Sequence, residues 1–285
     1  MNLKSRIQGS IYGLLIGDAL GVARSKKCQS SSLLISRYYS NAGGMTLCTI
    51  SSLVDCEKID PEDIANLFVD WYVAGYMVSH ESYIQGNPVI SQSIRHFNNG
   101  MPPDRCGDKT SLSDSALMRI LPIAIWCYNK SIEEIVKQAH IITNFTNLNA
   151  ETEVCSALLC LIVRGILLQK KEKVFDILKQ YYEEFNQTEH ITALNKVLSN
   201  TNSEVQNSFW HAWGAYADHQ DDFDKVMDVI LRKPNPSSTV SIAGALAGAN
   251  VGIEEIPKRW LNQLYLPEGG QGIINKFVTM TLKGS

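Results

Sequence analysis

Apolar residues recur three or four positions apart along most of the chain, which is the spacing that one face of an α-helix presents. The pattern predicts an amphipathic helix over 7–19 and another over 64–74, and the Asp-Pro-Glu-Asp run at 60–63 is a helix-start signal. Further helices are predicted over about 111–128, 131–143, 150–169, 172–185, 203–217, 222–231, 238–251 and 269–283. Alternating strand patterns are nearly absent, so the chain is expected to be helical throughout.

Breaks in this pattern predict loops at 29–44, 85–88 and 99–110, where glycines and prolines interrupt any regular element. No fixed-period repeat and no low-complexity linker divides the sequence. We therefore expect an all-α fold, with residues 1–285 forming one compact multi-helix domain.

Composition excludes several classes of protein. The 285 residues are 45% hydrophobic, which is enough to bury a large core, and the formal net charge is −3. Such a balance, without a run of Lys or Arg, gives no footprint for a nucleic-acid backbone. The seven cysteines include no CxxC pair, which argues against a disulfide framework and against a structural zinc site.

The longest apolar run, residues 154–168, is interrupted by Arg164 and is shorter than the roughly 20 residues needed to cross a bilayer. It is predicted to be a buried core helix. The N-terminal apolar stretch is broken by Gly13, Gly17 and Asp18, which makes it a poor signal peptide. We therefore expect a cytoplasmic protein with neither a membrane nor a nucleic acid as its partner.

A loop followed by a helix of small residues stands at 233–249. Two prolines and two serines supply a turn and a helix N-cap, and the Ala-Gly-Ala-Leu-Ala-Gly-Ala run at 243–249 leaves little side chain on the helix surface. This run predicts that another helix packs unusually close to it.

Four other segments of the chain have distinctive sequences. Residues 9–21 read Gly-Ser-Ile-Tyr-Gly-Leu-Leu-Ile-Gly-Asp-Ala-Leu-Gly, and residues 113–123 read Ser-Asp-Ser-Ala-Leu-Met-Arg-Ile-Leu-Pro-Ile. Residues 87–100 hold a loop and a following helix, and residues 252–260 carry Gly-x-x-x-Ile-Pro-x-x-Trp. Together with 233–249, these segments resemble the signatures of the ADP-ribosylglycohydrolase family. The resemblance runs from residue 7 to residue 260 and implies that family's all-helical fold.

The resemblance also implies a chemistry that this chain is not equipped to perform. Members of the family hold two magnesium ions with aspartates of a Thr-Asp-Asp-Thr and an Asp-Thr-Asp-Thr segment, and cleave the glycosidic bond to ADP-ribose. The four matching positions here are Leu47, Cys48, Asn235 and Ser237. Leucine offers no ligand, a thiol is a soft donor, and the two polar residues carry no charge. We therefore expect neither a metal site nor a cofactor.

Two further positions depart from the family in the same direction. The family's early glutamate corresponds to Ser25, and a histidine after threonine is replaced by Asn147. Asp18, in the opening signature, is the remaining candidate for a catalytic acid. The resemblance assigns ligand-binding roles to Thr46, Gly86, Asn87, Ser113, Asp114, Ser115, Met118, Asn147, Asn235 and Ser238.

Three functions are compatible with these residues. The expected one is a catalytically degenerate protein that binds ADP-ribose, an ADP-ribosylated protein or a related nucleotide. An alternative is an active hydrolase in which Asp18 and Asp114 act without metal, or with a monovalent ion, on an altered substrate. The other is a structural or partner-binding protein that uses the fold only. Loss of the metal-binding aspartates favours the first, because charge in a defined place is what the family's reaction requires.

Each candidate also has a plain structural interpretation. Asp18 lies near a helix end beside glycines and is suited to accept backbone hydrogen bonds. Thr46 and Ser238 are suited to be N-caps, and Asp114 is suited to cap the helix that carries Met118. The six histidines share no metal-ligand spacing, so each is expected to be a surface or packed residue.

Overall fold

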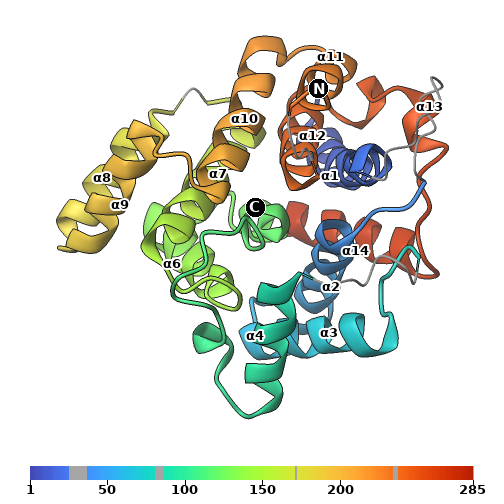
Figure 1. The fold of residues 1–285 in the computed structure, drawn as a ribbon. Coiled ribbons are helices and arrows are strands. Elements are labelled where there is room, and N and C mark those ends of the chain that lie inside the picture. The colour runs from blue at the N-terminus through green and yellow to red at the C-terminus, as the bar shows by residue number, and fades with distance from the viewer. Residues whose placement is uncertain (26–36, 81–86, 171, 234–236, 285) are drawn as a thin grey trace.

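The computed structural model describes residues 1–25, 37–80, 87–170, 172–233 and 237–284. Within these ranges the chain is helical and contains no strand, apart from one isolated bridge between Asp108 and Asn147 (Figure 1). The helices are α1 Leu3–Ser25, α2 Asn41–Cys56, α3 Pro61–Ala74, α4 Pro88–Asn98, η2 Pro103–Arg105, η3 Leu117–Arg119, α5 Leu121–Trp126, α6 Ile132–Thr143, α7 Ala150–Leu168, α8 Val174–Glu184, α9 Thr188–Ser199, α10 Glu204–His219, α11 Phe223–Ile230, α12 Ser237–Val251, η4 Ile253–Glu255, α13 Lys258–Leu261 and α14 Gly270–Lys283. The all-α prediction is therefore confirmed.

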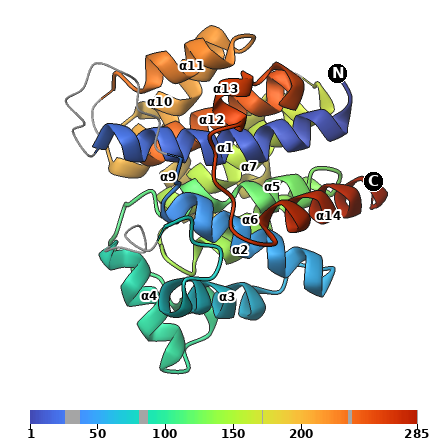
Figure 2. The ribbon, with the colours of Figure 1, turned by 90° about the vertical axis from the view of Figure 1, so that its right-hand side faces the viewer.

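Helices α1 and α12 lie side by side in both ribbon views, and glycines set their separation (Figures 1 and 2). A Cβ added at Gly13 of α1 would be 2.1 Å from the carbonyl oxygen of Gly244 on α12, and one at Gly9 would be as close to that of Gly248. No side chain fits at such distances, so the two backbones are in direct contact. The close helix pairing predicted from the small-residue run is confirmed.

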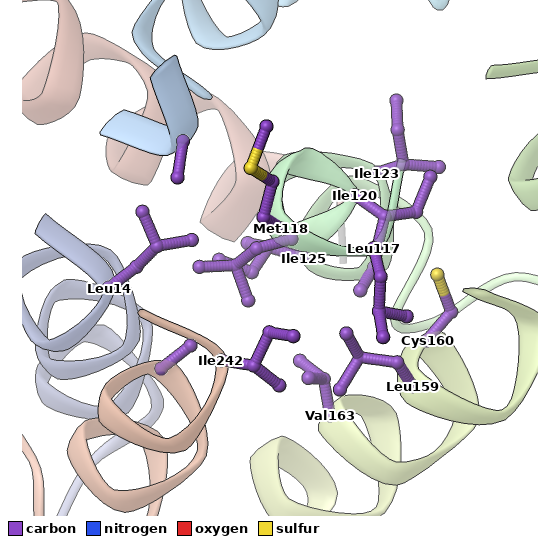
Figure 3. Close-up of a cluster of buried hydrophobic side chains, with 14 of the residues drawn as sticks. Leu14, Leu117, Met118, Ile120, Ile123, Ile125, Leu159, Cys160, Val163 and Ile242 are labelled. Atoms are coloured by element: carbon purple, nitrogen blue, oxygen red, sulfur yellow. The ribbon is translucent and has the colours of Figure 1, made fainter. Parts of the chain in front are cut away.

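The hydrophobic core extends over most of the described helices, and one part of it lies where η3 and α5 meet α1, α7 and α12 (Figure 3). Leu14 of α1, Ile242 of α12 and Val163 of α7 point toward the side chains of Met118 and Ile125. All five residues are at most 5% exposed. Helix α7 therefore spans the interior, as the apolar run at 154–168 predicts, and none of the described helices is long and apolar enough to cross a bilayer.

The start of α3 agrees with the helix-start signal predicted at 60–63. Asp60 is the N-cap of α3, and its carboxylate accepts hydrogen bonds from the backbone N–H groups of Glu62 and Asp63. Those two donors have no partner within the helix, so the cap stabilises its first turn. The six described cysteines form no disulfide, in agreement with the sequence pattern.

Two predictions of local structure are wrong, and helix α9 was missed. Residues 111–116 form a loop that leads into η3 and α5, rather than a continuous helix over 111–128. Helix α2 begins at Asn41, inside the predicted loop 29–44, and α9 was not predicted at all. Helix α2 was missed because it is buried on nearly every side, which removes the polar face that makes a helix recognisable in a sequence.

Helices α8 and α9 form an antiparallel pair at one edge of the molecule (yellow in Figure 1). Both helices pack against α7, and α6 packs against α7 beside them. The outer pair is thus joined to the body through α7, whose first turn follows the loop 144–149.

Candidate functional site

Asp18 is fully buried on α1 and faces the start of α2. One carboxylate oxygen accepts hydrogen bonds from the backbone N–H groups of Ser40 and Gly43, both at 2.8 Å, and the other accepts from the Ser40 hydroxyl at 2.6 Å. Ser40 is the N-cap residue of α2, and its own side chain does not cap the helix. The carboxylate of Asp18 therefore supplies the acceptor that the first turn of α2 requires.

Burial raises the pKa of Asp18, while the hydrogen bonds from Ser40 and Gly43 act in the opposite direction. Both oxygens are occupied by donors of the protein itself, and the side chain is 0% exposed. This is the plain structural role that the sequence allowed for Asp18. In this arrangement the carboxylate has no free, exposed edge with which to reach a substrate.

Leu47 and Cys48, at two of the four positions where the resemblance implies metal-binding aspartates, are both 0% exposed on α2. Burial raises the pKa of the Cys48 thiol well above its usual value, and the nearby charge of Asp70 raises it further. The thiol is therefore protonated at neutral pH, and the protonated form is neither a metal ligand nor a nucleophile. These two positions contribute to the core.

Thr46 lies inside α2 and not at its start, so the prediction that it is an N-cap is wrong. Its hydroxyl is fully buried and has no hydrogen-bond partner among the described residues. Ser238 is likewise the second residue of α12 and not its N-cap. Residues 234–236, which precede α12, lie outside the described ranges.

Four candidates form one hydrogen-bonded chain across three loops. The Asn87 amide, at the start of α4, donates to the Ser115 hydroxyl at 2.9 Å, and the Ser115 and Ser113 hydroxyls are 3.0 Å apart. The Asn147 amide donates to the Ser113 hydroxyl and carbonyl, both at 3.2 Å. Positions up to 60 residues apart in sequence, from Asn87 to Asn147, are thus brought to one place.

The series of hydrogen bonds continues inward from Asn147 to the buried guanidinium group of Arg119. Thr146 donates its hydroxyl to the Asn147 side-chain oxygen at 2.7 Å and accepts from Arg119 at 2.9 Å. Arg119 is 0% exposed, also donates to the carbonyl of Ile142, and lies over the ring of Phe68 with its guanidinium carbon 5.2 Å from the ring centroid. Burial lowers the pKa of Arg119 to about 9. Its hydrogen bonds and the ring contact hold the loop that carries Asn147.

A second group of candidates gathers around Asp114. Its carboxylate accepts from the Ser208 hydroxyl of α10 at 2.5 Å, and Ser208 in turn accepts from Thr239 of α12 at 3.3 Å. The Ser238 hydroxyl lies 3.6 Å from the sulfur of Met118. Asp114 does not cap the helix that carries Met118, because the N-cap residue of η3 is Ala116 and the Asp114 side chain accepts from Ser208 instead. That prediction is wrong.

Burial raises the pKa of Asp114, and the hydrogen bonds from Ser208 and Ser238 counteract part of this rise. The Asp114 backbone N–H also donates to this carboxyl group, and all of these donors are neutral, so they stabilise a carboxylate less than a cation would. The neutral form of Asp114 is therefore favoured over a wider pH range than in water.

Two residues of sequence interest, and the side chains of two others, are outside what the structure describes. Gly86 and Asn235 lie outside the described residues, as do the side chains of Ser25 and Ser237. Among the described residues that contribute to the two groups, Ser208 and Thr146 were not singled out from the sequence. Thr146 is the threonine that precedes Asn147 in the segment similar to the family's Thr-His, whereas Ser208 stands in no distinctive pattern and only the fold brings it to Asp114.

The described residues do not fit a pair of magnesium ions. Magnesium requires a near-octahedral set of oxygen ligands at about 2.0–2.1 Å, with carboxylates to offset its charge. The α2 positions present an alkyl chain at Leu47 and a protonated thiol at Cys48. Asp18 is held by Ser40, and Asp114 is held by Ser208.

What the two groups offer instead is neutral hydrogen bonding. The amides of Asn87 and Asn147 and the hydroxyls of Ser113, Ser115 and Ser238 are donors and acceptors without charge. Asn87 and Ser113 are partly exposed, whereas Ser115 and Asn147 are buried behind them. Such an arrangement suits the hydroxyl and amide groups of a polar ligand.

Comparison with known proteins places this geometry in a family. The model of the ADP-ribosylglycohydrolase family matches residues 1–282. A solved structure described as an "ADP-ribosylglycohydrolase-related protein complex" is similar with a TM-score of 0.75 and 20% sequence identity, over 100% of this chain and 99% of that chain. A search of curated proteins gives no significant match. Because the family model spans nearly the whole sequence, the chain belongs to the ADP-ribosylglycohydrolase family.

Proposed function

We propose that this protein binds ADP-ribose, an ADP-ribosylated protein or a related nucleotide, and does not hydrolyse it with magnesium. The observation that carries the proposal is the state of Leu47 and Cys48, which are buried in the core where carboxylates would have to face a metal. The ligand class is that of the family to which the chain belongs.

The polar residues around the site support retained binding. Asn87, Ser113, Ser115 and Asn147 remain in one hydrogen-bonded chain, although the implied metal-binding positions carry no carboxylate. Asn87 and Ser113 are the partly exposed members and are the ones we expect to contact the ribose hydroxyls of a ligand. Asp18 supports the absence of catalysis, because both of its oxygens already accept hydrogen bonds from Ser40 or Gly43.

Calorimetric titration of the full chain with ADP-ribose, in magnesium and in a chelator, tests this proposal. We expect binding whose affinity is the same in both buffers, because no described ligand set depends on the ion. Asn87→Ser keeps an N-cap residue on α4 but removes the amide donor to Ser115, and Ser113→Ala removes one hydroxyl. Each substitution should weaken binding roughly two- to tenfold, as expected for about 0.5–1.5 kcal/mol per hydrogen bond.

Ser199→Ala is the matched control, because Ser199 is an exposed residue at the end of α9 whose hydroxyl donates to the carbonyl of Asn195 in the same helix. It should leave affinity unchanged. Absence of ADP-ribose binding would favour a protein that uses the fold for structure or partner binding only. Turnover that is abolished by Asp18→Asn would favour the altered hydrolase instead.

A further inference from the structure

Outside the candidate site, three side chains with metal-binding groups come together on separate helices. They are His140 of α6, Glu153 of α7 and His190 of α9, and one ligand atom of each lies within 4.8 Å of the others. His190 and Glu153 are in contact, with 2.5 Å between the imidazole Nε2 and a carboxylate oxygen. The imidazoles of His140 and His190 are stacked, with ring centroids 4.8 Å apart.

The donor set has the chemistry of a transition-metal site. Two imidazoles and one carboxylate are a set that zinc uses when a water completes its tetrahedral shell, whereas magnesium and calcium prefer oxygen alone. We propose that His140, Glu153 and His190 form a binding site for Zn²⁺. The proposal is independent of ADP-ribose binding, since none of the three residues belongs to the site of Asn87 or Asp114.

Residues around the trio are placed to hold its members. The Tyr182 hydroxyl of α8, which is fully buried, lies 3.0 Å from Nε2 of His140, and the Asn144 side chain bonds to Glu153. Hydrogen bonds of this kind orient metal ligands in proteins. Glu153 and His190 keep 12% and 18% of their side-chain surface exposed, which leaves an ion a path to the site.

Binding requires a small rearrangement. Two ligands of a tetrahedral zinc ion are about 3.3 Å apart when the metal–ligand bonds are about 2.0–2.1 Å, and the present donor atoms are spread over up to 4.8 Å. The imidazoles of His140 and His190 are inclined by only 9°, and parallel rings do not aim two nitrogens at one point. If the His190 ring rotates out of this stack, Zn²⁺ can occupy the space that the ring now fills beside Glu153. All three ligand atoms can then reach the ion.

The position of the trio gives such an ion a structural consequence. His140 and Glu153 flank the loop 144–149, which carries Asn147, and His190 lies on the outer helix pair at the edge of the molecule (Figure 1). An ion bound to all three would join α9 to the ends of α6 and α7 at this loop. Zinc should therefore raise the free energy of unfolding, and the rise should grow with the ratio of zinc concentration to the Kd of the site.

The test is titration of the full, reduced, chelator-treated chain with Zn²⁺ by calorimetry. We expect one ion per chain and a rise in melting temperature. Glu153→Gln, which keeps the shape of the side chain, and His190→Ala should each lower affinity by roughly 100-fold or more, since loss of an outer partner alone costs about 10–100-fold. Tyr182→Phe should lower zinc affinity by about 10–100-fold, because it removes only the hydroxyl near His140.

Two controls separate this site from adventitious binding. His219→Ala, on α10, and Cys56→Ser, at the end of α2, should leave zinc affinity unchanged. In the native chain, NMR signals of the His140 and His190 rings should shift together on zinc addition while those of His219 stay fixed, a readout that needs no variant to fold. Lack of zinc binding, or binding lost in Cys56→Ser and retained in Glu153→Gln, would overturn the proposal.

Discussion

Asp18 shows how one residue of a family signature can be fully accounted for by the stability of the fold. Its carboxylate joins α1 to the first turn of α2 through Ser40 and Gly43, which are 22 and 25 positions away in sequence. Donors of a helix start that are buried without an acceptor cost free energy, so the carboxylate is required by the fold whether or not any reaction occurs. Only a measurement that separates stability from turnover distinguishes the two roles.

Asp18→Asn should reduce the free energy of unfolding by about 1–3 kcal/mol, because it places an NH₂ group among buried N–H and O–H donors. Denaturant unfolding followed by circular dichroism measures this loss. Asp55→Asn is the control, since Asp55 is an exposed residue near the other end of α2 and should change stability by less than about 0.5 kcal/mol. Equal stability of the two variants would contradict the capping role.

Asp114 should make stability depend on pH. Burial raises its pKa in the folded protein above the ordinary value of 3.8, so the fold favours its protonated form. Protonation of Asp114 therefore makes its full contribution to the free energy of unfolding below about pH 3.8. This contribution is lost as pH rises through the raised pKa of Asp114 in the folded state. The free energy of unfolding of the native chain, relative to Asp114→Asn, should fall as pH rises in this range. A relative stability that increases with pH would show that the pKa is lowered instead.

At the scale of single residues, the sequence indicates which types matter but not what they contact. The candidates Asn87, Ser113 and Asn147 can be marked from their segments alone, and the structure brings them into one hydrogen-bonded chain. Ser208 cannot be found that way, because a serine within a helix is common and its contact with Asp114 spans 94 positions.

At the scale of helices, the contact of α1 with α12 depends on glycine at defined positions. Gly13→Ala or Gly244→Ala would place a methyl group 2.1 Å from a backbone oxygen of the other helix, so the two helices must move apart. We expect a loss of about 1–3 kcal/mol or more in the free energy of unfolding, as for other overpacked cores. Thermal and denaturant unfolding measure it.

Gly214→Ala in α10 is the same chemical change, but we expect it to raise the free energy of unfolding and not to lower it. Apart from the neighbouring residues and backbone of α10 itself, no atom of the described residues lies within 4 Å of a Cβ at Gly214, so alanine should stabilise that helix by about 0.5–1 kcal/mol. If Gly244→Ala were as stable as Gly214→Ala, the close packing of α1 and α12 would be wrong.

Helix recognition from the sequence succeeds where a helix has one buried face and a capping residue. Helix α3 satisfies both conditions through Asp60 and the apolar positions that follow it. Helix α2 satisfies neither, because its residues 42–54 are all buried and its cap acceptor comes from Asp18 on another helix. The loop at 111–116 was mistaken for a helix because its polar serines were outweighed by the apolar run after residue 117.

At the scale of the whole molecule, the family's fold is retained, while the residue types differ from aspartate at the positions where the resemblance implies metal ligands. The glycines that join α1 to α12 and the core around Met118 are in place (Figure 3). Leu47 and Cys48 extend the core into the position of two implied aspartates. A fold does not determine its chemistry, and here the substituted residues are the ones on which the chemistry would depend.

The sequence predicts this division because the missing carboxylates can be read directly from it. It does not predict the zinc site, because His140 and His190 are 50 positions apart and Glu153 lies between them without any motif spacing. Groups that converge only through tertiary packing, such as these three side chains, become visible when α6, α7 and α9 are assembled.

Release of ADP-ribose from an ADP-ribosylated arginine or serine peptide, measured against magnesium concentration, tests the central claim most directly. With Leu47 and Cys48 buried in place of carboxylates, we predict a release rate that stays at the level of the protein-free control at every magnesium concentration. A rate that rises with added magnesium, and falls again when the ion is chelated, would contradict the account.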